Sequence, residues 1–205
     1  MPILRTLLAS GLLLVLGGAA LTVATDGFQA FTSETARRLA VRREPPLVPA
    51  VLLETQSGAR LNLADLRGRW VLVDFVYTRC QSWCLALGGE FAQLQDQLAA
   101  PLAEDKLVLL SISFDPAHDT PAELSAYQER FRSRGHGWIA ARPMSDEGSR
   151  QLLRTFGVTV VPDGMGGYVH NAAIHVVDPQ GRLVRILDTG NTQTVAQTVR
   201  DDIER

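Results

Sequence analysis

Residues 70–89 read "WVLVDFVYTRCQSWCLALGG", in which a strand pattern is followed by a helix pattern. Its first part, Trp70–Tyr77, is a short β-branched and aromatic run of the kind that fills a central strand buried on both faces. Apolar residues then recur at steps of mostly three and four over residues 85–98, which predicts an amphipathic helix. Both cysteines of the chain, Cys80 and Cys84, lie at this junction. In open α/β sheets ligands bind beyond the carboxyl ends of strands, so we expect the functional site here.

The rest of the domain alternates strand and helix patterns. Further strands are expected at residues 106–114, 138–141, 172–177 and 182–188, and further helices at residues 120–131, 146–156 and 192–203. Thr120 followed by Pro121 is typical of a helix start. The turn sequence "DPQG" joins the last two strands as a hairpin. This order predicts an α/β sandwich with a mixed central sheet.

The N-terminus carries an apolar run that predicts a membrane-targeting segment. "LLASGLLLVLGGAALTVA", residues 7–24, has no charge and is long enough to span a bilayer. We expect a retained transmembrane helix rather than a cleaved signal peptide. The expected organisation is an anchor at residues 1–25, a tether at 26–50 and one domain at 51–205. Basic residues follow the apolar run, yet long domains are translocated largely regardless of such charge, so we expect the domain on the extracytoplasmic side of the inner membrane.

The overall charge excludes one class of partner. Twenty basic side chains stand against twenty-two acidic ones, a formal net charge of -2 at pH 7. Nucleic-acid binding needs a basic surface that this balance does not supply. We therefore expect no nucleic-acid partner.

The cysteine pair fits three chemistries. If the stretch is helical, two side chains separated by three residues lie one turn apart and can meet each other or one ion. A helix N-terminus, and Arg79 next to Cys80, both favour the thiolate form. A structural disulfide would stabilise little, because so short a loop removes little chain entropy. The redox dithiol and the metal site are therefore favoured over the disulfide, which stays open. Structural zinc needs four ligands, whereas Cu(I) accepts two thiolates and one imidazole.

Four histidines are available to complete a metal site. His118 and His136 lie in stretches typical of a solvated surface, and His175 lies inside an expected strand, where packing is the usual role. His170 stands near the end of "PDGMGGYVHN", residues 162–171, a glycine-rich connection that enters a strand. The mobility of such a connection would bring the imidazole over the cysteine pair. Spacing makes His170 a candidate ligand without deciding the matter, since most loop histidines are not ligands.

Three segments of the chain carry a resemblance to a known family. They are "VDFVYTRCQSWC" at residues 73–84, "LLSISFDPAHDTPAELSAYQERF" at 109–131 and "YVHNAAIHVVDPQGRL" at 168–183. In this order they resemble the Sco/SenC proteins, which assemble the copper site of cytochrome c oxidase. An ordered set of motifs is far more specific than a lone cysteine pair.

The resemblance implies a fold, an anchor and a ligand set. It implies a thioredoxin-like fold with an N-terminal membrane anchor, and copper bound by Cys80, Cys84 and His170, as Cu(I) with Cu(II) as the other oxidation state. Asp115 and Asp119 match acidic positions of the family, where we expect a turn and cap role as much as tuning of the metal.

The chain departs from the family pattern around the expected ligands. Residues other than the usual ones stand at Gln81, Ser82, Trp83, Leu85, Val169 and Asn171. These differences leave the ligands in place and change their surroundings, so metal affinity and reduction potential are less constrained than the ligand set.

Two functions follow from the resemblance. The first is delivery of copper to the copper-bearing subunit of a respiratory cytochrome c oxidase, with other copper donors or thioredoxin-like proteins as further partners. The alternative is a thiol-disulfide oxidoreductase that uses Cys80 and Cys84 to keep the oxidase subunit's cysteines reduced. The first would make the protein a metallochaperone rather than an enzyme.

Overall fold

The structure, a computed structural model, describes residues 2–79, 83–135 and 137–205, with the backbone only for residues 83–85. Contacts divide the chain into two compact units, Met1–Glu44 and Pro45–Arg205. The finer division into anchor, tether and domain stays a prediction.

The first unit contains two helices. Helix α1, Pro2–Ala24, has a mean hydropathy of 2.2 and no buried side chain, and it is long and apolar enough to cross a membrane. Helix α2, Ser33–Arg43, begins after Thr32, whose side chain accepts a hydrogen bond from the N–H of Thr35. Part of the expected tether is thus helical in the structure.

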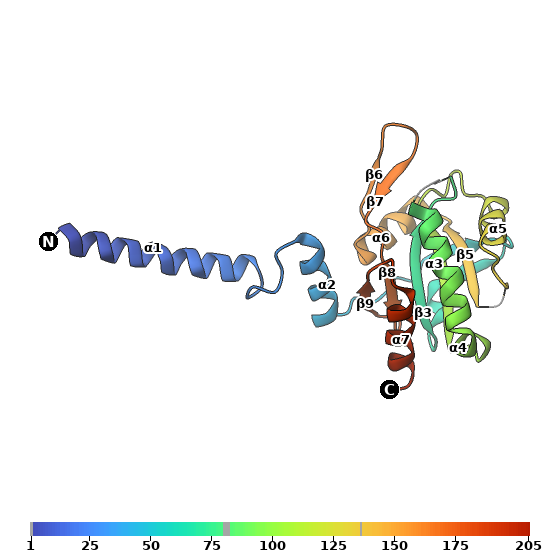
Figure 1. The fold of residues 1–205 in the computed structure, drawn as a ribbon. Coiled ribbons are helices and arrows are strands. Elements are labelled where there is room, and N and C mark those ends of the chain that lie inside the picture. Colours follow the sequence, from blue (N-terminus) through green and yellow to red (C-terminus); the bar gives the residue numbers. More distant parts are fainter. Residues whose placement is uncertain (1, 80–82, 136) are drawn as a thin grey trace. The chain divides into compact units, whose positions relative to one another are not determined.

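The second unit is built on a seven-stranded sheet with the order β2-β1-β5-β4-β3-β8-β9 (Figure 1). Its strands are β1 Leu52–Thr55, β2 Arg60–Asn62, β3 Trp70–Val76, β4 Leu107–Ser113, β5 Trp138–Pro143, β8 Ile174–Val177 and β9 Leu183–Leu187. The three central strands β3, β4 and β5 are parallel, and the outer pairs are antiparallel. The expected α/β fold with a mixed central sheet is therefore confirmed.

Helices cover both faces of this sheet. They are the short 3₁₀ helix η1 Leu63–Leu66 and the helices α3 Trp83–Gln97, α4 Ala99–Ala103, α5 Pro121–Arg130, α6 Asp146–Phe156 and α7 Thr192–Ile203. Side chains alternate between faces along a strand. Leu72 and Val76 of β3 accordingly join the core cluster with α3, α5 and α7. Phe75 points the other way and packs its ring on Phe156 of α6 at 5.2 Å.

The glycine-rich stretch around residue 165, expected as a connection that enters a strand, contains secondary structure of its own. It forms a second sheet of two short antiparallel strands, β6 Val160–Pro162 and β7 Tyr168–His170, which projects from one end of the main sheet (Figure 1). The turn between them is stabilised by Asp163, whose Oδ1 accepts hydrogen bonds from the N–H groups of Met165 and Gly167. His170 therefore lies on a strand.

Candidate metal centre

The carboxyl ends of β3 and β4 meet at one edge of the sheet. The two strands are parallel and in register, so that Val76 lies beside Ser113. The segment after β3 leads through Tyr77, Thr78 and Arg79 to Cys80, and the segment after β4 leads through residues 114–119 to α5. Sheet topology thus brings residues 115–119, the "DPAHD" loop, close to residues 77–79, which directly precede Cys80. This is the sheet edge where a site is expected on this fold.

Asp119 holds the chain at Thr78, two residues before Cys80. Its carboxylate is fully buried and accepts hydrogen bonds from the Thr78 N–H, at 3.2 Å to each oxygen, and from the Thr78 hydroxyl at 2.6 Å. The Ser113 hydroxyl donates to the same carboxylate at 2.5 Å. Burial raises the pKa of Asp119, and these donors oppose the rise. Asp119 therefore has a structural role other than the expected turn and cap: it fixes the backbone two residues before Cys80, whereas Thr120 caps α5.

Asp115 binds Arg79 and His118 at the same edge. Its Oδ2 accepts from Arg79 Nη2 at 2.7 Å, and its Oδ1 lies 2.8 Å from His118 Nδ1. Burial pushes the pKa of Asp115 up, but the hydrogen bonds from His118 and Arg79 outweigh it and leave that pKa lowered. The carboxylate therefore stays charged and positions Arg79, the residue before Cys80.

His170 approaches this edge from β7. Its ring lies 5.0 Å from the ring of Phe114, measured between centroids, in an edge-to-face contact. Phe114 directly precedes Asp115, so His170 lies close to the start of the "DPAHD" loop. Burial lowers the pKa of the His170 imidazole. A neutral imidazole is the form that binds a metal ion, so this environment suits a ligand at neutral pH.

The strand that carries His170 is fastened to β3 by a tyrosine. The N–H of Tyr168 donates a hydrogen bond to the Tyr77 hydroxyl oxygen at 3.2 Å. The Tyr77 hydroxyl in turn donates to the Tyr168 carbonyl oxygen at 3.4 Å. The rings of Tyr77, Phe114 and Tyr168 also pack on one another at centroid distances of 5.2 to 5.7 Å. This aromatic cluster places His170 next to the segment that ends in Cys80.

The structure leaves the meeting of the three expected ligands untested. Cys80 lies outside the described residues, and Cys84 occupies the first turn of α3 with only its backbone described. Apart from these cysteine side chains, the described residues contain no group of three or more His, Cys, Asp and Glu side chains that would hold a metal. The ligand set of Cys80, Cys84 and His170 therefore remains a proposal.

The other histidines have different roles. His175 is 1% exposed, and its Nδ1 lies 3.3 Å from the Val73 carbonyl oxygen, as expected for a packed strand residue. His118 has an exposed side chain, as expected, but it is also a partner of Asp115. His136, expected on the surface, lies outside the described residues.

Two further carboxyl groups, Asp74 of β3 and Glu90 of α3, interact electrostatically within the domain. Asp74 is fully buried and pairs in register with Ser111 of β4. Burial raises the pKa of Asp74 to about 7, and the charge of Glu90 on α3 adds to the rise, while Ser111 opposes it. Burial also raises the pKa of Glu90, whose Oε1 accepts from the Gly190 N–H at 2.8 Å.

Sequence reasoning did not single out Asp74, Tyr77 or Thr78 as functional. Asp74 lies inside an apolar run, "VLVDFV", where a lone carboxyl was a visible signal of an unusual core position. The partners of Tyr77 and Thr78 lie tens of residues away in the sequence, and only the folded chain brings them together.

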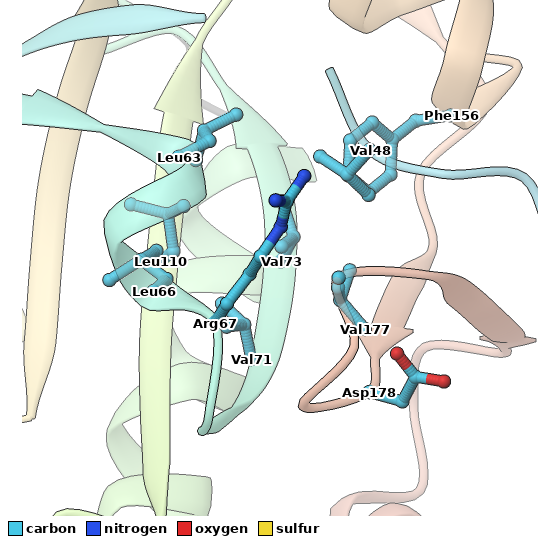
Figure 2. Close-up of a pocket in the computed structure, with 11 residues that line it drawn as sticks. Val48, Leu63, Leu66, Arg67, Val71, Val73, Leu110, Phe156, Val177 and Asp178 are labelled. Atoms are coloured by element: carbon cyan, nitrogen blue, oxygen red, sulfur yellow. The ribbon is translucent and has the colours of Figure 1, made fainter. Parts of the chain in front are cut away.

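A small cavity elsewhere in the domain is too small for a substrate. Its volume is about 20 Å³, which is room for roughly one water molecule. Figure 2 shows Arg67 reaching between the apolar side chains of Leu63 and Leu66 on η1 and those of Val48 and Phe156. The cavity is lined by the first half of β3, away from the strand end that leads to Cys80.

Comparison with known proteins identifies the family. The family described as SCO1/SenC matches residues 42–204. The chain belongs to the SCO1/SenC family. A protein of Stutzerimonas stutzeri that is named for copper binding is 30% identical over 187 residues, which are 89% of this chain and 88% of the relative.

Solved SCO1/SenC structures share the fold. ScoI of Arabidopsis thaliana, solved with copper bound, matches with a TM-score of 0.66 at 20% identity, over 78% of this chain and 99% of that one. BsSco, described as a member of the Sco family of cytochrome c oxidase assembly proteins, matches with a TM-score of 0.64 at 22% identity, over 78% and 93%. At such identity the likeness concerns the fold, which confirms the expected thioredoxin-like architecture of this SCO1/SenC chain.

Proposed function

We propose that this protein binds copper through Cys80, Cys84 and His170 and delivers it to the copper-bearing subunit of a respiratory cytochrome c oxidase. The observation that carries the proposal is His170, a half-buried imidazole with a lowered pKa, which packs on Phe114; Phe114 in turn packs on Tyr77, three residues before Cys80. Membership of the SCO1/SenC family supports it, as do the relative named for copper binding and the solved family structures that contain copper.

The chemistry of the donor set fits copper. Thiolates are soft ligands that suit Cu(I), which accepts low coordination numbers, and an imidazole also binds Cu(II). Cys84 lies in the first turn of α3, where the positive end of the helix dipole favours thiolate. Copper would be the cargo of the protein, passed on by ligand exchange rather than retained.

We place the protein at the inner membrane. Helix α1 would be the single membrane span, because it is the candidate span found among the described residues and its side chains are not buried. The copper domain would lie on the extracytoplasmic side, where it would meet the oxidase subunit and copper donors or thioredoxin-like proteins.

A thiol-disulfide oxidoreductase is the second candidate. The same features that favour thiolate at Cys80 and Cys84 favour attack on a disulfide. In that case the pair would reduce the cysteines of the oxidase subunit before they take up copper.

Copper stoichiometry separates the two candidates. Residues 45–205 form a compact unit with its own core, so they can be expressed alone and loaded anaerobically with Cu(I). We expect about one copper per chain in the wild type, and strongly weakened binding in Cys80→Ser, Cys84→Ser and His170→Ala. His118→Ala is the matched control and should bind as the wild type does. Undiminished binding in His170→Ala, together with disulfide reduction by the wild type, would favour the oxidoreductase.

A further inference from the structure

The histidine of the proposed site lies on an element that is not part of the main sheet. Strands β6 and β7 pair only with each other among the described strands. A two-stranded hairpin is marginally stable by itself, so its position depends on its contacts with the body of the domain. The placement of His170 is therefore set by whatever fastens this hairpin.

Among the described residues, Asn171 and Tyr77 hold the hairpin at two places through hydrogen bonds. At the base, Asn171 accepts from the Thr159 N–H at 2.7 Å and donates to the Gly157 carbonyl at 3.0 Å. These contacts join the two ends of the hairpin to each other. The link to the sheet is made by Tyr77, whose hydroxyl contacts both the N–H and the carbonyl oxygen of Tyr168.

The backbone is shaped to admit this hydroxyl. A Cβ atom added at Gly167 would lie 3.0 Å from the Tyr77 hydroxyl oxygen and 2.6 Å from Asp163 Oδ2. The absence of a side chain at Gly167 thus leaves room for the hydroxyl against the backbone directly before Tyr168. The contact is specific to the hydroxyl, because a phenylalanine ring in its place would keep the packing on Phe114 but lose both polar contacts.

We propose that Tyr77 is a positioning residue for the copper site, and that its hydroxyl holds β7 so that His170 stays beside the chain leading to Cys80. Tyr77 lies three residues before Cys80, and Tyr168 lies two residues before His170. One side chain therefore ties the cysteine-bearing segment to the histidine-bearing strand. The inference rests on the proposed copper binding and adds to it the residue that brings the ligands together.

The expected effect follows from the population of binding-competent molecules. Without the hydroxyl, β7 occupies its position for a smaller fraction of the time, and apparent affinity falls in proportion to that fraction. One net hydrogen bond corresponds to about a fivefold change. We expect Tyr77→Phe to weaken Cu(I) binding about fivefold through His170.

The test compares Tyr77→Phe with Tyr127→Phe in residues 45–205. Tyr127 is a buried tyrosine on α5 whose ring packs on Phe131 and Trp138. Cu(I) affinity is measured by competition with a chromophoric chelator, alone and in a His170→Ala background. Amide hydrogen exchange over residues 160–170 is measured in the copper-free protein. We expect weaker binding and faster exchange in Tyr77→Phe only, and no further loss of affinity when His170 is already alanine.

The outcomes separate this inference from the proposed function. If the wild type binds no copper, the proposed function fails and the inference falls with it. If the wild type binds copper and Tyr77→Phe binds it equally well, only the inference is overturned. A loss of affinity that persists undiminished in the His170→Ala background would also overturn it, because Tyr77 would then act through another group.

Discussion

Asp119 binds Thr78 through both the backbone N–H and the hydroxyl, and so a carboxylate from the β4–α5 loop fixes the chain two residues before Cys80. The contact spans forty-one residues of sequence. Three donors, two from Thr78 and one from Ser113, satisfy the buried carboxylate. The chain is thus held at Thr78 before it reaches Cys80.

Asp119→Asn should weaken this fixed point. The amide has one acceptor oxygen in place of two, and its NH₂ group would face donors, so a buried donor loses its partner. We expect the free energy of unfolding to fall by about 1–3 kcal/mol in urea titrations. Asp201→Asn, on the exposed face of α7, is the control and should change little. Equal stability of the two variants would contradict the role assigned to Asp119.

Asn171→Ala should loosen the base of the β6–β7 hairpin. Its two hydrogen bonds, to Thr159 and Gly157, would be lost, and we expect a loss of about 1–2 kcal/mol in unfolding free energy. The distinguishing measurement is amide exchange over residues 160–170, which should become faster. Asn191→Ala removes the cap of α7 and should cost about 1 kcal/mol without affecting exchange in the hairpin. Hairpin exchange unchanged in Asn171→Ala would show that other contacts fix it.

The sequence allowed strand β3 and helix α3 to be predicted, because a buried strand and an amphipathic helix have different periodicities. It did not allow the β6–β7 hairpin to be predicted, because three-residue strands are too short to show alternation. The contact of Tyr77 with Tyr168 spans ninety-one residues, and no local pattern encodes such a pairing. His170 was found as a candidate, but the aromatic packing that lowers its pKa is a property of the folded chain.

Two adjacent glycines of α3 should respond oppositely to alanine. A Cβ atom at Gly88 would collide with the Phe131 ring, whereas one at Gly89 would meet no atom within 4 Å. Gly88→Ala should therefore destabilise the domain by about 1–3 kcal/mol through overpacking. Gly89→Ala should stabilise it by about 0.5–1 kcal/mol through higher helix propensity. Thermal unfolding of both variants checks the pair, and a shift of the same sign in both would disprove the assigned packing.

Asp74→Asn should remove a pH dependence of stability. The pKa of Asp74 is raised by burial from 3.8 to about 7 in the folded protein, with Glu90 of α3 and Ser111 of β4 as the polar groups identified around it. Below pH 3.8 both folded and unfolded chains hold the proton. Between pH 3.8 and about pH 7 only the folded chain keeps the proton on Asp74. The free energy of unfolding therefore falls by about 1.4 kcal/mol per pH unit as the pH rises through this range.

The asparagine variant lacks this titration, so its stability should fall less steeply than that of the wild type between about pH 5 and about pH 7. The two curves should run parallel above that range, because the wild-type carboxyl is then ionised in both states. Urea unfolding across this range measures the difference in slope. Asp201→Asn serves as the control, since its carboxyl lies on an exposed helix face and should leave the wild-type slope intact. A wild-type slope retained in Asp74→Asn would mean that another group, with Glu90 the first to test, holds the proton.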